Sequence, residues 1–93
     1  LTDQQNVTTI EFKIQIFASK NPIYMAPSNF KGLENIEEYI DKDLYKYTFG
    51  IAEDFEYARD VLLNQMKRLG YQDAFVVGFV NGKRTTLLKA HGL

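Results

Sequence analysis

The stretch at residues 44–70 constrains the fold most, because it places a strand pattern and a helix pattern in direct succession. Its first part alternates aromatic residues with others at the period of two that is typical of a β-strand. After Gly50 comes an apolar pattern with helical spacing, for which Asp54 is the expected N-cap and Gly70 the expected end. A strand that passes through a glycine into an amphipathic helix indicates an α+β domain in which this helix covers a sheet.

Other segments supply the rest of that sheet. Residues 9–17 alternate strictly and are expected to turn their isoleucines toward the core. Residues 35–41 form a weaker, acidic strand that pairs with residues 44–49 as a hairpin. Residues 73–80 are apolar on both sides, which indicates a strand that is covered on both faces or carries a ligand on one of them.

The crossover between the first two strands, residues 18–33, contains two prolines, two asparagines and a glycine. These residues interrupt a long helix, so we expect at most a single turn with Ser28 as its cap. The order strand, irregular crossover, strand, strand, helix, strand predicts a ferredoxin-like or RNP-like split βαββαβ fold. That fold has a four-stranded antiparallel sheet, here with one main helix and a degraded first helix. The first and third strands are central neighbours in it, and one sheet face stays open.

The chain divides into a polar linker at residues 1–8, a domain at residues 9–88 and a tail at residues 89–93, with residues 85–88 as a candidate extra edge strand. Leu1 is not an initiator methionine, so we expect an excised piece of a longer protein, with a signal or anchor upstream. The absence of cysteine excludes disulfides, thiol catalysis and cysteine-ligated zinc. The apolar runs are too short for a membrane span.

No group of residues in the sequence predicts catalysis, a cofactor or a metal. His91 is the single histidine and lacks the partners that a metal or catalytic site requires, so we expect an inert tail residue. The carboxylates at residues 34–43 gather on one hairpin, whereas a glycosidase needs two on facing walls of a cleft. The net charge of -1 and the pI of about 5.8 argue against a nucleic-acid partner. We therefore expect a binding module rather than an enzyme.

The helix-free sheet face is where we expect a ligand, because aromatic rings lie there among amide, ammonium and hydroxyl groups. The residues of this face are Lys13, Gln15, Phe17, Leu44, Lys46, Thr48, Phe75, Val77 and Phe79. Such a mixture suits a sugar chain, whose rings offer apolar C–H faces and polar rims. It also suits stacked bases of a single-stranded nucleic acid. A third interpretation is a protein interface, with a partner, a second copy or the rest of the parent chain.

Several short motifs resemble the SPOR domain, the peptidoglycan-binding module of bacterial cell-envelope proteins. In chain order they are FKIQIFAS at residues 12–19, YKYTFG at 45–50, Ala58 in the helix, LGY at 69–71 and AFVV at 74–77. Their order and spacing are similar to the family over about residues 10–84. The proline-containing crossover and the ending NGKR resemble the variety found in Bacteroidetes, which is often attached to N-acetylmuramoyl-L-alanine amidases or to envelope lipoproteins.

The resemblance implies non-catalytic binding of glycan strands that have lost their stem peptides. Such binding would target a parent protein, for example an amidase, to the septum or to remodelled cell wall. The implied location is the periplasm or cell envelope, and other cell-division or envelope proteins are further expected partners. The alternative that the residues leave standing is a protein–protein interaction or self-association domain that uses the same face.

The resemblance also implies site residues, position by position. Gln15 matches the first-strand glutamine of the family, and Ser19 matches its serine with an offset of one residue. Lys46 stands where the family often has arginine. Leu44 stands where some members have tryptophan, so Phe17 or Phe75 is expected to supply the stacking ring instead. The expected glycan-binding residues are thus Gln15, Phe17, Ser19, Leu44, Lys46, Thr48 and Phe75.

Overall fold

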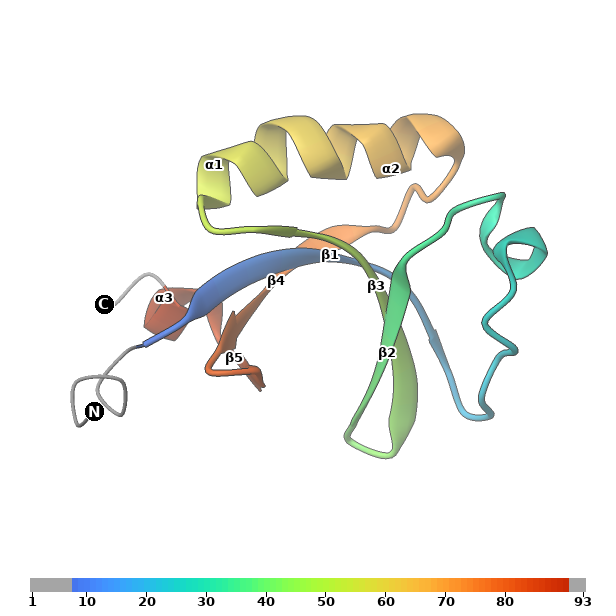
Figure 1. Ribbon diagram of the computed structural model, residues 1–93, viewed down its shortest axis with the longest axis horizontal. Coiled ribbons are helices and arrows are strands. Elements are labelled where there is room, and N and C mark those ends of the chain that lie inside the picture. Colours follow the sequence, from blue (N-terminus) through green and yellow to red (C-terminus); the bar gives the residue numbers. More distant parts are fainter. Residues whose placement is uncertain (1–7, 91–93) are drawn as a thin grey trace.

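The computed structural model describes residues 8–90 and shows an α+β domain, with a helix lying along one face of a curled antiparallel sheet (Figure 1). Five strands form the sheet in the order β2-β3-β1-β4-β5. They are β1 (Ile10–Ser19), β2 (Ile36–Asp41), β3 (Leu44–Ala52), β4 (Phe75–Val80) and β5 (Lys83–Thr85). Each adjacent pair is antiparallel, and β1 and β3 are neighbours as predicted.

The prediction of a four-stranded sheet was wrong, because the chain turns back at once after β4. Asn81 and Gly82 have φ angles of 52° and 79°, and the type I′ turn of a two-residue hairpin requires positive φ at both central residues. This turn pairs β5 with residues 78–80, so the fifth strand begins two residues before the candidate edge strand at residues 85–88 and overlaps it at Thr85. Part of that candidate segment belongs to a short helix, α3 (Leu87–Ala90).

The main helix is one continuous segment made of α1 (Phe55–Tyr57), the π-helical turn η3 (Ala58–Leu62) and α2 (Leu63–Leu69). The Asp54 side chain caps its start, since Oδ2 accepts a hydrogen bond from the backbone N–H of Tyr57 at 3.0 Å. Gly70 follows the last turn with a φ of 124°, a conformation that favours glycine. Both predicted helix boundaries are therefore confirmed.

The first crossover contains only one 3₁₀ turn, η2 (Pro27–Phe30). Its N-cap is Ala26, which makes no side-chain hydrogen bond, so the prediction of Ser28 as the cap was wrong. The turn begins at Pro27, two residues before a cap at Ser28 would allow, because proline suits the first helical position. Phe30 is buried against Tyr47 of β3, with ring centroids 5.2 Å apart, and this contact anchors the crossover to the sheet.

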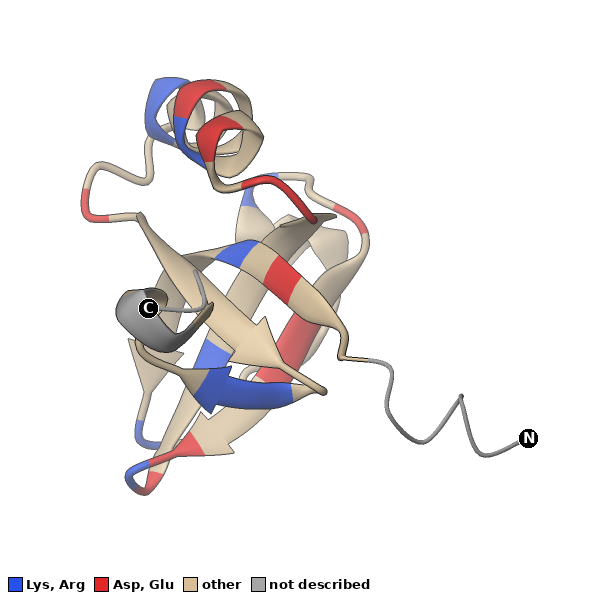
Figure 2. Ribbon diagram, turned by 90° about the vertical axis from the view of Figure 1, so that its left-hand side faces the viewer, with Lys and Arg blue, Asp and Glu red and all other residues tan. Residues whose placement is uncertain are grey.

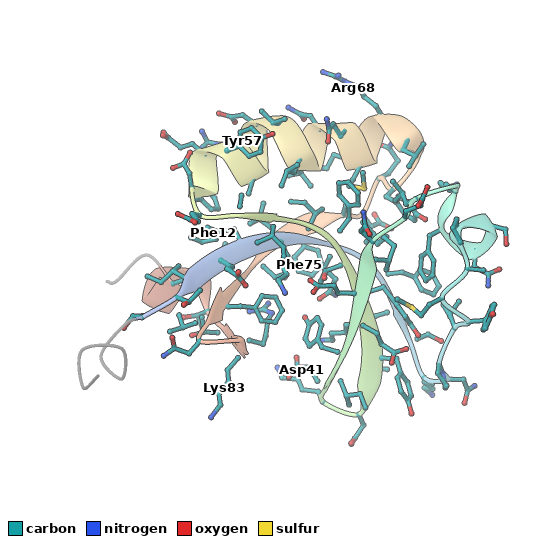
Figure 3. All side chains as sticks on the ribbon, viewed as in Figure 1. Phe12, Asp41, Tyr57, Arg68, Phe75 and Lys83 are labelled. Carbon is teal, nitrogen blue, oxygen red and sulfur yellow. The ribbon has the colours of Figure 1, made fainter. Side chains whose placement is uncertain are left out.

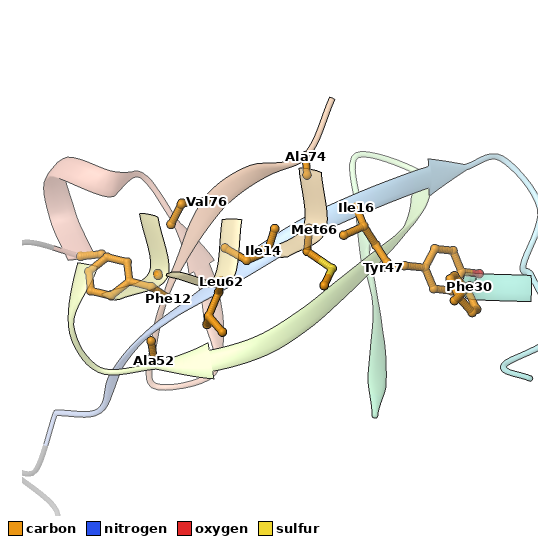
Figure 4. Close-up of a cluster of buried hydrophobic side chains, with 12 residues drawn as sticks. Phe12, Ile14, Ile16, Phe30, Tyr47, Ala52, Leu62, Met66, Ala74 and Val76 are labelled. Atoms are coloured by element: carbon orange, nitrogen blue, oxygen red, sulfur yellow. The ribbon is translucent and has the colours of Figure 1, made fainter. Parts of the chain in front are cut away.

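The core lies between the helix and the sheet (Figure 4). Its buried members are Phe12, Ile14, Ile16, Phe30, Tyr47, Ala52, Ala58, Leu62, Met66, Ala74, Val76 and Ala90. Ala90 packs over Gly78, where an added Cβ would lie 2.8 Å from the Ala90 Cβ. Ala90, in the segment predicted as a tail, therefore belongs to the packed core. Residues 1–7 of the predicted linker and residues 91–93, with His91, lie outside the described residues.

The helices within residues 8–90 are all too short or too polar to cross a membrane.

Candidate functional site

The helix-free side of the sheet, called the concave face below, has a defined cross-strand register. Glu37 of β2 pairs with Thr48 of β3, which pairs with Gln15 of β1, which pairs with Phe75 of β4. Paired residues in adjacent strands share a face, so these four side chains form one row across the sheet. Both ends of the sheet bend away from the helix, which makes this side the hollow one (Figure 1).

The curl is strong enough to bring β2 and β4 into side-chain contact across the hollow. The rings of Tyr39 in β2 and Phe79 in β4 meet edge to face, with centroids 5.1 Å apart. In a flat sheet these strands would lie about 14 Å apart, since two strands separate them. As a result Thr48, Val77 and Phe79 are buried on a face that the sequence pattern predicts to be open. The prediction of an open face was therefore wrong for its centre.

Gln15 lies at the centre of this face and is 7% exposed. Its Oε1 accepts a hydrogen bond from the Tyr39 hydroxyl at 2.8 Å. Its Nε2 makes no hydrogen bond to any of residues 8–90. Every fully buried side-chain nitrogen or oxygen in that part of the chain has a hydrogen-bond partner, so Nε2 must reach solvent. Its partner in β4 is Phe75, which is 46% exposed. Figure 3 labels Phe75 on the side of the sheet away from the helix. A free amide donor thus adjoins an exposed ring.

The lysines of the concave face are paired within the protein. The ammonium group of Lys13 lies 2.9 Å from a carboxylate oxygen of Glu37 and 4.6 Å from the centroid of the Phe79 ring. The ammonium group of Lys46 lies 2.8 Å from a carboxylate oxygen of Asp41. Both lysine side chains are largely buried. A ligand that contacts either ammonium group must therefore share it with a carboxylate already in place.

Charges from the two edges of the sheet meet at the mouth of the concave face. The hydrogen bond from Lys46 holds the pKa of Asp41 below its usual value, and the charges of Lys42 and Arg84 act in the same direction. Arg84 belongs to β5, at the opposite edge from the strand of Asp41. Figure 2 shows basic residues of β5 and charged residues of the β2–β3 hairpin together at the end away from the helix.

Two predicted site residues do not lie on the concave face, because β1 contains a bulge. Gln15 pairs with Thr48 but Phe17 pairs with Tyr47, so Ile16 is an extra residue on one strand. Beyond the bulge the side chains change face. Phe17 is 47% exposed and lines a pocket that also contains Phe30 and Tyr71. Ser19 pairs with Tyr45 on that same side, and its Oγ accepts a hydrogen bond from the Asn21 N–H at 3.3 Å.

The other predicted residues, Gln15, Leu44, Lys46, Thr48 and Phe75, share the concave face. Leu44 lies at its margin, opposite Asp41 next to the hairpin turn. The strongest omission from the predicted set is Tyr39, together with the acidic residues of β2. The period-two pattern of residues 36–41 could have placed them, since it puts Glu37, Tyr39 and Asp41 on one side.

Within residues 8–90 no cluster of His, Cys, Asp and Glu side chains could hold a metal ion. The concave face instead offers one free amide donor, one exposed ring and two ion pairs. No family model, no curated protein and no solved structure matches this chain. An inference about function therefore depends on the geometry of the concave face together with the sequence motifs.

Proposed function

We propose that this domain is a non-catalytic module that binds glycan strands of peptidoglycan, stripped of their stem peptides, on the concave face. In this way it would deliver a parent envelope protein to the septum or to remodelled cell wall. The strand order supports the underlying fold assignment. Without the added edge strand β5, the order β2-β3-β1-β4 with one helix between β3 and β4 is that of a ferredoxin-like split βαββαβ fold whose first helix has degraded to η2.

The observation that carries the proposal is the free Nε2 of Gln15 beside the exposed ring of Phe75. A sugar ring presents an apolar C–H face, which can pack on an aromatic ring, and polar groups at its rim. A buried carboxamide next to that ring can bind one of those polar groups while the ring holds the apolar face. The carboxylates of Glu37 and Asp41, held by their lysines, extend the polar surface on one side.

The charge of the concave face also argues against a nucleic acid as the ligand. Lys13 and Lys46 each already neutralise a carboxylate, so neither offers an unpaired cation for a phosphate. Nucleic-acid binding depends on unpaired basic residues that follow the phosphates. A glycan needs hydrogen-bond partners and an apolar platform instead, and both are present.

The test is a pull-down of the domain with intact peptidoglycan and with amidase-treated peptidoglycan. We expect stronger retention by the treated material, in which the glycan strands are free of peptides. Phe75→Ala should reduce this retention by about tenfold, since burying an apolar side chain such as phenylalanine is worth roughly 1.5–3 kcal/mol. Phe17→Ala is the matched control, because Phe17 is equally exposed, 47% against 46%, on the opposite face. It should leave retention unchanged.

Equal retention by the two preparations, unaffected by Phe75→Ala, would contradict the proposal. A protein interface on the same face would give a different result. In that case sedimentation would show a mass that rises with protein concentration, Phe75→Ala would abolish the rise, and no glycan would bind.

A further inference from the structure

Gln15 can meet a ligand with only one end of its side chain. Its acceptor, Oε1, is occupied by the Tyr39 hydroxyl at 2.8 Å, and its donor, Nε2, is left free. Gln15 is buried, with 7% of the residue exposed, so its side chain has little freedom to turn away. Toward a ligand, this carboxamide therefore donates and does not accept.

Tyr39 is held in place independently of Gln15. Its ring packs edge to face on Phe79, with centroids 5.1 Å apart. Its strand is also tied to β1 by the ion pair between Lys13 and Glu37 at 2.9 Å. A phenol donates a hydrogen bond more readily than it accepts one, because its oxygen lone pair is delocalised into the ring. If the Gln15 carboxamide flipped, its Oε1 would lose the hydrogen bond that the Tyr39 hydroxyl donates. Its Nε2 would instead face the Tyr39 oxygen, which is a poor acceptor.

We propose that Tyr39 fixes the Gln15 carboxamide as a hydrogen-bond donor and so makes the site between Gln15 and Phe75 select a carbonyl or carboxylate oxygen of the ligand. The proposal rests on the function proposed above and names the group that this part of the face recognises. A hydroxyl can also accept this hydrogen bond, but its own proton must then go to water or to the Glu37 carboxylate, which already pairs with Lys13, whereas an sp² oxygen has no proton to satisfy. Tyr39 is a positioning residue in this scheme.

Two groups on a denuded glycan carry such an oxygen. One is the acetamido group of each amino sugar, whose methyl group suits the exposed ring of Phe75. The other is the carboxylate that remains on the glycan when a stem peptide is removed. Both offer the same chemistry to Nε2, and oligosaccharides of defined composition separate them.

The experiment titrates the isotope-labelled domain with a tetramer of N-acetylglucosamine, which has acetamido groups but no carboxylate. Cellotetraose, with hydroxyls in place of the acetamido groups, is the matched probe. We expect the side-chain amide signals of Gln15 to shift with the acetylated tetramer and the cellotetraose affinity to be at least about tenfold lower. If denuded peptidoglycan strands bind but neither tetramer does, the carboxylate is the recognised source of the oxygen.

Variants distinguish the proposed roles of Gln15 and Tyr39 in ligand binding from a role in folding stability. Gln15→Glu keeps the acceptor for the Tyr39 hydroxyl but removes the donor, so affinity for the acetylated tetramer should fall at least about tenfold. Gln65→Glu makes the same charge change on the exposed side of the helix and should have no effect. Tyr39→Phe keeps the ring contact and should reduce the discrimination between the two tetramers, because the carboxamide is then free to flip. Thermal unfolding of each variant reports whether it is folded.

Equal affinity of the wild-type domain for the two tetramers would overturn the selectivity while leaving glycan binding intact. Unchanged binding in a folded Gln15→Glu variant would overturn the role of Nε2. Failure of every glycan, denuded strands included, would instead overturn the proposed function itself.

Discussion

Tyr39 and Phe79 touch edge to face at a centroid distance of 5.1 Å, although β3 and β1 lie between their strands. This contact closes part of the concave face over Phe79, whereas Phe75 on the same face stays exposed to a ligand. It also sets the position from which the Tyr39 hydroxyl reaches Gln15. The curvature of the sheet therefore determines which side chains of the concave face a ligand can reach. It also determines that Gln15 presents a hydrogen-bond donor to that ligand.

We predict that Tyr39 and Phe79 are coupled in stability. Aromatic pairs in this geometry contribute about 0.5–1.5 kcal/mol beyond the area that each ring buries. The double-mutant cycle of Tyr39→Ala and Phe79→Ala, measured by urea denaturation, should give a coupling energy in that range. Tyr57, exposed on the helix, supplies the control, and Tyr57→Ala should be additive with Phe79→Ala. Additivity of Tyr39→Ala with Phe79→Ala would mean that the curl does not depend on this contact.

A second prediction concerns the attachment of α3 to the sheet. An alanine at Gly78 would place its Cβ 2.8 Å from the Cβ of Ala90, closer than two side-chain carbons can pack. Gly78→Ala should therefore destabilise the domain by about 1–3 kcal/mol, the usual cost of overpacking. Adding Ala90→Gly removes the clashing atom and should restore most of that loss.

The control for this rescue is Gly82→Ala. Gly82 has open space around it but a φ of 79°, so alanine there is strained by the backbone and not by a neighbour. Its cost of about 1 kcal/mol should be unaffected by Ala90→Gly. If Ala90→Gly fails to rescue Gly78→Ala, then α3 does not pack on β4 in solution. Thermal denaturation of the four variants measures both effects.

A third prediction concerns the ion pair at the hairpin. The hydrogen bond from Lys46 lowers the pKa of Asp41 from 3.8, so the pair stabilises the folded state above the unfolded pKa and loses this effect as the pH falls through the folded value. Lys46→Gln should raise the Asp41 pKa toward 3.8, as seen in an NMR titration of the carboxyl carbon. The pKa of Asp60, lowered by Arg59 on the helix, should not change. An unaltered Asp41 pKa in the variant would show that the pair does not form.

The alternation of residues along the strands predicted faces correctly wherever the strands are regular. Leu44, Lys46 and Thr48 lie on the concave face as expected, because the irregularity of β3 comes only after Phe49. In β1 the same rule holds up to Gln15 and then fails at Phe17. A bulge adds one residue to one strand only, and its position depends on the partner strand.

The contact between Tyr39 and Gln15 could not be predicted from the sequence for a different reason. Sequence alternation assigns a residue to a face, but it does not say how far the sheet curls. Whether residues of non-adjacent strands meet depends on twist accumulated over the whole sheet. The burial of Val77 and Phe79 has the same origin, since both were assigned to the correct face and expected to be open. The chemistry of the site was thus partly foreseeable, and its accessibility was not.

The last prediction concerns how the helix-poor crossover stays in place. The Tyr47 hydroxyl is buried, accepts a hydrogen bond from the Ile23 N–H at 2.6 Å and donates one to a carboxylate oxygen of Glu38 at 2.8 Å. Burial raises the pKa of Tyr47, so the hydroxyl keeps its proton and both bonds. Tyr47→Phe removes both partners at once, and leaving the Ile23 N–H unpaired should cost about 1–3 kcal/mol of folding stability.

Tyr45→Phe is the matched control for this change, because Tyr45 lies on the same strand and face but makes no hydrogen bond through its hydroxyl within residues 8–90. It should alter the free energy of unfolding by less than about 0.5 kcal/mol. Hydrogen exchange gives the local readout, since the Ile23 amide should lose protection in Tyr47→Phe while amides in β4 change only with global stability. Equal protection of Ile23 in the two variants would mean that the contact of Phe30 with the Tyr47 ring alone holds the crossover against the sheet.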